Sequence, residues 1–135
     1  MRCVFDTNVF ISALLSPKSK PREAVDLASR KGAILLSFEA LAELNEVLGR
    51  KQFRRYIDED DIRRFLAALT RESEWIDANV SITACRDSKD DKFLSLAVSG
   101  HATHIVTGDF DLLALHPFED IQILSPQMFL KSETL

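Results

Sequence analysis

The sequence predicts an α/β fold in which helices cover both faces of a parallel five-stranded sheet, a three-layer α/β/α sandwich. Two observations support this prediction. Short apolar runs typical of buried strands alternate with longer segments of helical periodicity along the 135 residues, which indicates repeated strand–helix–strand units. Several of these runs also end in an acidic or small polar residue, as buried parallel strands do at a sheet edge. We expect residues 1–135 to form one domain.

The segment from Arg2 to Asn8 is the one around which the chain is organised. Residues 2–5 suit a short buried strand, Asp6 follows it directly, and the apolar run 9–15 suits a buried helix. Ligands of open α/β sheets bind beyond the carboxyl ends of strands, which places Asp6 where chemistry is usually done. Asp and Asn are also favoured helix caps. For Asp6 alone, a functional role and a capping role are equally good interpretations.

The remaining elements follow in regular alternation. Further strands are predicted at residues 33–37, 75–76, 104–107 and 121–124, and helices at 22–31, 38–50, 58–74 and 93–98. Shorter helical turns are predicted at 112–115 and after Ser125. Ser37 suits the cap of the helix that follows it, and Asp111 suits the cap of the turn at 112–115.

Composition places the chain among ordinary globular proteins. Hydrophobic residues make up 46% of the sequence and charged residues 28%. No apolar run approaches the roughly 20 residues that span a membrane. The N-terminal segment does not follow the signal-peptide pattern, and two cysteines do not make a disulfide framework, so we expect a cytoplasmic protein. The net charge of −4 weighs mildly against a broad nucleic-acid surface, which is usually basic.

Acidic residues recur where the predicted strands end or the following helices begin. The set is Asp6, Glu43, Asp90, Asp91 and Asp109. Carboxylates brought within a few Å of one another repel unless a cation is present, and oxygen ligands suit Mg²⁺ or Mn²⁺. Such an ion polarises a phosphoryl oxygen. Any single acid could instead be a cap, as Asp87 and Asp90 could be at a helix N-terminus, but the whole set favours a metal centre.

In these segments the sequence resembles the PIN-domain ribonucleases of the VapC-like type, toxin components of bacterial and archaeal toxin–antitoxin systems. The resemblance covers essentially the whole chain. It rests on four segments in order, at residues 4–8, 41–44, 90–97 and 105–109. It implies a Rossmann-like sheet of order 3-2-1-4-5, cleavage of RNA that depends on Mg²⁺ or Mn²⁺, a small antitoxin protein as partner, and a homodimer.

The resemblance also assigns the acidic site. It carries the catalytic set onto Asp6, Glu43, Asp90 and Asp109. The metal ligands are then Asp6, Asp109 and one member of the Asp90–Asp91 pair. Ala97 matches a position where the helix of this family usually has a small residue, and counting back from it favours Asp90 as the ligand. Because the two acids are adjacent, Asp91 stays an alternative.

Polar and basic neighbours complete the expected site. By the resemblance, Thr7, Asn8 and Thr107 position a metal-bound water or a phosphate oxygen; turn and cap hydrogen bonds are the alternative role. Arg54 and Arg55 lie in the most basic stretch of the chain and could contact RNA or a partner. An ordinary solvated surface is an equally good interpretation of these two arginines.

Two other functions compete with the nuclease. A haloacid-dehalogenase-like phosphatase would have an Asp-x-Asp motif after the first strand, and this chain has Asp6-Thr7-Asn8, although Gly108-Asp109 fits that pattern. A non-catalytic PIN-like module that only binds RNA or protein would not need the complete acid set.

Overall fold

The computed structural model describes residues 1–85 and 88–133, so the cap expected at Asp87 lies outside the described residues. Its five strands pair in parallel in the order β3-β2-β1-β4-β5, which confirms the predicted sheet. The strands are β1 (Arg2–Phe5), β2 (Ala33–Leu36), β3 (Glu74–Trp75), β4 (His104–Val106) and β5 (Gln122–Leu124).

The central strand β1 is apolar because it is covered on both faces. Cys3 pairs with Ile34 of β2 on one side and with His104 of β4 on the other. Cys3, Val4 and Phe5 are all buried. Burial raises the pKa of the Cys3 thiol to about 12, so this cysteine acts as a core residue.

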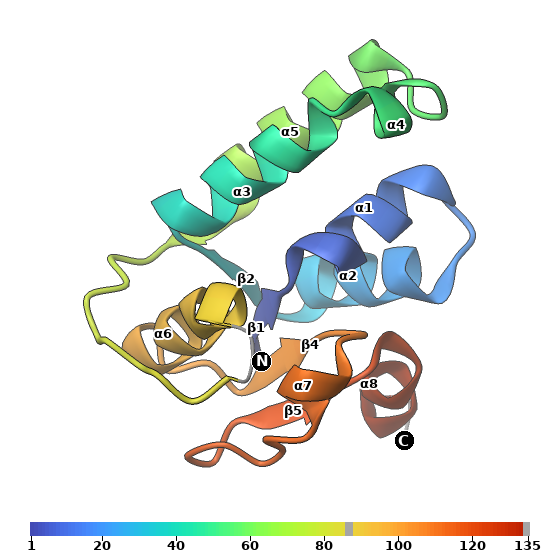
Figure 1. The fold of residues 1–135 in the computed structure, drawn as a ribbon. Helices are drawn as coiled ribbons and strands as arrows, with labels where there is room; N and C mark the ends of the chain where they lie inside the picture. The colour runs from blue at the N-terminus through green and yellow to red at the C-terminus, as the bar shows by residue number, and fades with distance from the viewer. Residues whose placement is uncertain (86–87, 134–135) are drawn as a thin grey trace.

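Helices form the two outer layers (Figure 1). They are α1 (Thr7–Leu15), α2 (Lys20–Lys31), α3 (Phe38–Leu48), α4 (Lys51–Arg54), α5 (Glu59–Glu72), α6 (Asp91–Ser99), α7 (Phe110–Leu113) and α8 (Pro126–Glu133), with a 3₁₀ turn, η1 (Ser88–Asp90), before α6. The helix α6 packs against one face of the sheet, and α2 and α8 pack together on the other. None of the helices in the described part of the chain is long and apolar enough to cross a membrane.

An aromatic cluster joins the helices to the central strand. The ring of Phe5 lies 5.4 Å from that of Phe10 and 6.5 Å from that of Phe129, measured between centroids. Phe10 in turn contacts Phe65 of α5 edge-on at 5.8 Å. Tilted and edge-on contacts of this kind add to the free energy of burial. The start of α1, where Asp6 lies, is therefore fixed between the sheet and α5.

Several predicted boundaries move by one or two residues, and one predicted cap was wrong. Ser37 caps α3 as expected, because its Oγ accepts a hydrogen bond from the backbone N–H of Ala40 at 3.1 Å. The helix predicted over 112–115 begins instead at Phe110. Its cap is Asp109, whose Oδ1 accepts from the N–H of Asp111 at 2.8 Å. Asp111 therefore lies inside the first turn of α7.

Candidate active site

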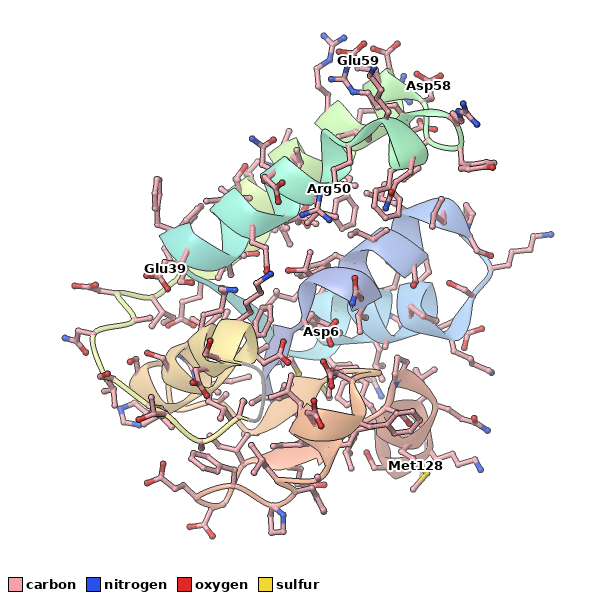
Figure 2. All side chains as sticks on the ribbon, in the orientation of Figure 1. Asp6, Glu39, Arg50, Asp58, Glu59 and Met128 are labelled. Carbon is pink, nitrogen blue, oxygen red and sulfur yellow. The ribbon has the colours of Figure 1, made fainter. Side chains whose placement is uncertain are left out.

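A polar cavity of about 310 Å³ opens where β1 and β4 end. Its wall brings together four of the predicted acids: Asp6, Glu43, Asp90 and Asp109. Figure 2 shows Asp6 near the middle of this face, with Arg50 toward the α3–α4 side. Arg50, Gln52 and Lys89 also line the cavity, so acidic and basic groups share one opening.

Three of the four acids occupy helix N-cap positions. Asp6 precedes α1, Asp90 precedes α6 and Asp109 precedes α7. The first turn of a helix leaves backbone N–H groups without helical partners, and Asp is a favoured cap for them. The side chains of Asp6 and Asp109 accept hydrogen bonds from the helices that they cap, whereas Asp90 makes no side-chain cap hydrogen bond. Capping therefore does not prevent Asp6 and Asp109 from lining the cavity.

Asp6 is held by donors on both of its oxygens. Its Oδ1 accepts from the N–H of Val9 at 2.9 Å, and its Oδ2 accepts from the hydroxyl of Thr107. The Thr107 oxygen also accepts from the N–H of Asp109 at 3.0 Å, so one hydroxyl connects both acids. Burial raises the pKa of Asp6, hydrogen bonds from Thr107 and from the backbone of Val9 and Asn8 oppose that rise, and the charge of Asp109 adds to it. A cation at this position would relieve the unfavourable burial of the charge.

Glu43 reaches the cavity from the middle of α3, opposite the sheet edge. Its Oε2 accepts from the hydroxyl of Thr7, and its Oε1 lies 3.1 Å from Nζ of Lys92. The same ammonium donates to the carbonyl oxygen of Lys89 at 2.6 Å. Sequence reasoning missed Lys92 because its partner lies 49 residues away. The only sequence signal was its place directly after the acidic doublet.

The two members of the acidic doublet face different ways. Asp90 lines the cavity. Asp91 has its Oδ1 turned to the preceding loop, where it accepts from the N–H groups of Ala84 at 3.1 Å and Cys85 at 2.7 Å. The hydrogen bond from Cys85 is the main reason that the pKa of Asp91 is lowered. Asp91 as a metal ligand stays a prediction.

The donor set suits a hard cation without forming a closed site. Among residues 1–85 and 88–133, no three His, Cys, Asp or Glu side chains are arranged to hold a metal ion. The cavity acids nevertheless offer only oxygen, the donor that Mg²⁺ and Mn²⁺ prefer, and the most buried of them, Asp6, has a raised pKa.

The other predicted site residues divide into two groups. Thr7 and Asn8 line the cavity, and Thr107 supports it through Asp6. Arg54 and Arg55 are exposed and lie outside the cavity wall. Among the described arginines, Arg50 lines the cavity, and it is held by Glu46 at 3.0 Å.

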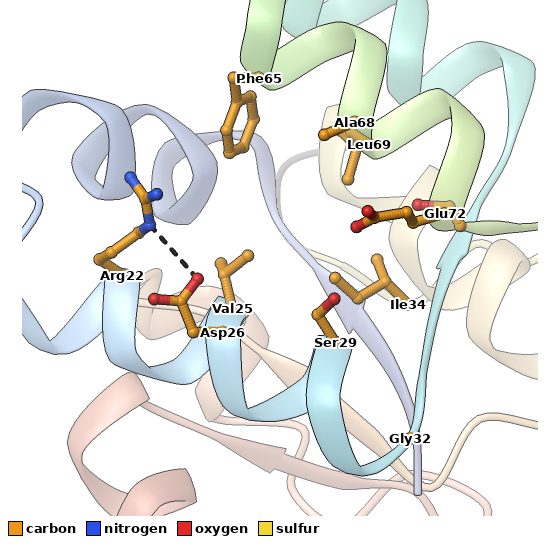
Figure 3. A pocket seen from close by; sticks show the side chains of 11 residues that line it. Arg22, Val25, Asp26, Ser29, Gly32, Ile34, Phe65, Ala68, Leu69 and Glu72 are labelled. Atoms are coloured by element: carbon orange, nitrogen blue, oxygen red, sulfur yellow. Dashed lines mark hydrogen bonds and ion pairs between the residues drawn. The ribbon is translucent and has the colours of Figure 1, made fainter.

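A larger cavity, of about 460 Å³, lies between α2 and α5 (Figure 3). Two acids line it, Asp26 and Glu72, and Asp26 is already paired with Arg22 at 3.3 Å. Apolar side chains such as Val25 and Leu69 form much of the remaining wall. Because it lacks a convergent set of carboxylates, this cavity does not offer the chemistry of the acidic one.

The chain is thus an α/β protein with a parallel sheet of order 3-2-1-4-5 and a cavity lined by carboxylates where its central strands end. The model of the PIN domain family matches residues 2–111. The chain belongs to the PIN domain family, which confirms the resemblance seen in its sequence.

The chain is also similar to proteins from other organisms. The uncharacterized protein MJ1680 of Methanocaldococcus jannaschii is 35% identical over 117 residues, 85% of this chain and 75% of that protein. The structure of VapBC2 from Rickettsia felis, bound to a DNA fragment from their promoter, matches with a TM-score of 0.62 and 18% identity over 91% of this chain and 97% of that chain. VapC20 of Mycobacterium tuberculosis, a sarcin–ricin loop cleaving toxin, matches with a TM-score of 0.51 and 13% identity over 89% of this chain and 98% of that chain. At these identities the two structures establish a shared fold.

Proposed function

We propose that this protein is a divalent-metal-dependent endoribonuclease and the toxin of a toxin–antitoxin pair. The observation that carries the proposal is the shared cavity of Asp6, Glu43, Asp90 and Asp109, which come from four separate elements. Family membership and the fold shared with VapC20, which cleaves the sarcin–ricin loop, support the same activity.

The roles of the side chains follow from their surroundings. Asp6, Asp90 and Asp109 would hold Mg²⁺ or Mn²⁺, and the bound ion would supply Lewis acidity toward a phosphoryl oxygen. Thr107 fixes the carboxylate of Asp6 through its hydroxyl.

Glu43 serves a different purpose in this proposal. Both of its oxygens are already oriented, by Thr7 and by Lys92, so it can accept a proton or a hydrogen bond from the attacking water. Arg50 and Lys89 on the cavity wall supply positive charge for the RNA phosphates.

Cleavage of labelled RNA oligonucleotides by the purified protein tests this function. We expect cleavage with Mg²⁺ or Mn²⁺, none in excess chelator, and little with Asp6→Asn. Water rather than the ribose 2′-hydroxyl would attack, so the products should lack a 2′,3′-cyclic phosphate. Turnover of p-nitrophenyl phosphate without RNA cleavage would favour the phosphatase alternative. RNA binding without cleavage would favour a non-catalytic module.

The proposal extends to partners and compartment. An RNA-cleaving enzyme that works in the cytoplasm must be restrained in its own cell, and the VapBC2 structure supports a small antitoxin protein in that role. We expect expression of the chain to arrest growth, and coexpression of a small protein encoded beside it to restore growth. Light scattering after size exclusion tests the proposed homodimer, which a monomer at high micromolar concentration would reject.

A further inference from the structure

A further cavity, of about 370 Å³ and called the second cavity below, lies directly beside the acidic one. Asn8 lines both cavities. Gly108 lines the second and its neighbour Asp109 lines the first, so the two openings meet along the end of β4. The far wall of the second cavity comes from the starts of α2 and α8, at Pro21 and Pro126.

The chemistry of this second cavity differs from that of the first. None of the described residues that line it is acidic. The amide side chains of Asn8 and Gln127 are exposed and can both donate and accept hydrogen bonds. Val9, Pro21 and Pro126 supply apolar surface. Apolar walls with a few amide groups suit a flat, polar-edged heterocycle, because unstacked RNA bases are held by packing of their faces and hydrogen bonds to their edges.

We propose that this cavity binds the base of the nucleotide next to the cleaved phosphodiester. The inference rests on the proposed nuclease function and adds a substrate subsite to it. The two cavities share Asn8 in their walls and meet between Gly108 and Asp109, so the subsite lies beside the acids. Lys20 lines its rim with a side chain that is 62% exposed, which makes its ammonium accessible to a backbone phosphate. The amides of Asn8 and Gln127 then make cleavage sensitive to the identity of this base.

Gly108 gives a way to block the subsite without disturbing the fold. A Cβ built at this position meets no atom within 4 Å, and its φ lies outside the left-handed region. The backbone therefore accepts a larger residue at position 108, and because Gly108 lines the cavity, a Val side chain there should narrow it.

The test compares two substrates in four proteins: the wild type, Gly108→Val, Gln127→Ala, and the control Gln122→Ala. Gln122 is exposed on β5 and lines neither cavity. We expect Gly108→Val and Gln127→Ala to raise KM for an RNA oligonucleotide by about 10-fold, within the range for loss of one base contact. Turnover of bis(p-nitrophenyl) phosphate, which has no flanking nucleotide, should change less than twofold. Gln122→Ala should change neither the KM for RNA nor the turnover of bis(p-nitrophenyl) phosphate. An unchanged RNA KM in Gly108→Val, or an equal loss on both substrates, would overturn the subsite.

Binding separates this inference from the nuclease proposal. Fluorescence anisotropy of a labelled RNA oligonucleotide is measured with Asp6→Asn, alone and combined with Gly108→Val. If the wild type cleaves no RNA, the proposed function fails. The subsite then stands on a rise of about 10-fold in Kd for the combined variant, and equal Kd values would reject it.

Discussion

The ammonium of Lys92 lies 3.1 Å from Oε1 of Glu43 and joins α6 to α3 at a carboxylate that lines the acidic cavity. The two side chains are 20% and 26% exposed, so the pair is screened less than a surface ion pair. Thr7 holds the other oxygen of Glu43. This carboxylate is therefore positioned by two elements that are distant in sequence.

Loss of the Lys92 ammonium should affect both stability and activity. We expect Lys92→Met to lower the free energy of unfolding by about 1–2 kcal/mol, between the values for exposed and buried pairs. RNA cleavage should fall about 10-fold because Glu43 loses its orientation. Urea unfolding and initial rates measure the two effects. Lys20→Met, which removes a more exposed pair with Glu23, is the matched control for stability alone, because Lys20 also lines the proposed base subsite; it should change stability by less than about 0.5 kcal/mol.

A double-mutant cycle shows whether Lys92 acts through Glu43. In a Glu43→Gln background, Lys92→Met should have little further effect on cleavage, because the group that it positions is already changed. Lys92→Arg should keep most of the activity, since it keeps the charge. An equal loss from Lys92→Met in both backgrounds would indicate a role that does not involve Glu43.

Asp6→Asn should abolish cleavage and yet stabilise the metal-free protein. Activity should drop by more than about 100-fold, the upper range for groups that only support a ligand. The pKa of Asp6 is raised above its ordinary value of 3.8 by burial, so the folded state binds this proton more tightly than the unfolded state. The free energy of unfolding of the wild type therefore falls as pH rises from about 3.8 through the raised pKa. Asp6→Asn has no carboxyl group to ionise at this position, so its free energy of unfolding does not fall for this reason.

Thermal melts across pH check the sign of this effect. In chelator at neutral pH, the Tm of Asp6→Asn should exceed that of the wild type, and the difference should shrink as pH falls toward 3.8, the ordinary value. A Tm of Asp6→Asn below that of the wild type at neutral pH would show that the charge of Asp6 stabilises the metal-free fold.

Divalent cations should stabilise the folded protein as well as activate it. An ion that binds only the folded state adds about 2.7 kcal/mol at 100 times its Kd, which corresponds to a rise in Tm of several degrees. Differential scanning fluorimetry with increasing Mn²⁺ measures the shift, and Asp6→Asn should reduce it. No shift at millimolar Mn²⁺ would contradict a metal site in this cavity.

Most of the order of elements and the cavity acids could be predicted from the sequence, because both depend on local patterns, but the short helix α4 and the turn η1 were not predicted. Apolar runs that end in Asp predict a strand and the cap of the next helix, as at Asp6. The topology of a parallel sheet then collects such ends at one edge. Glu43 was harder to place, since it lies inside a helix, and it was included because the helix that carries it begins at the same sheet edge.

Contacts between segments that are distant in sequence were not accessible in the same way. The pairing of Lys92 with Glu43 depends on how α6 packs against α3. The difference between Asp90 and Asp91 depends on the position of Ala84 and Cys85 beside α6, since both backbone N–H groups donate to Asp91. Periodicity and composition carry no information about either contact.

The acidic doublet can be resolved by substitution. Asp90→Asn should reduce cleavage by at least about 10-fold if Asp90, which lines the cavity, holds the ion. Asp91→Asn keeps an oxygen that can accept from Ala84 and Cys85, so its activity should stay within a few-fold of the wild type. Rates and Mn²⁺ affinity measured side by side decide between them, and the reverse ranking would assign the ligand to Asp91.

Arg50, rather than Arg54 or Arg55, should carry the contact with the RNA backbone. Arg50 lines the acidic cavity and its guanidinium is held by Glu46, whereas the two later arginines are exposed away from it. Arg50→Ala should raise the Kd for RNA and reduce the slope of log Kd against log salt by about 1, the effect of one lost phosphate contact. We expect Arg54→Ala and Arg55→Ala, the matched controls, to leave both the Kd and the slope unchanged. Anisotropy titrations at several salt concentrations, carried out in an Asp6→Asn background to prevent cleavage, measure both quantities. A larger effect from Arg54 or Arg55 than from Arg50 would move the RNA path onto the outer surface of α4.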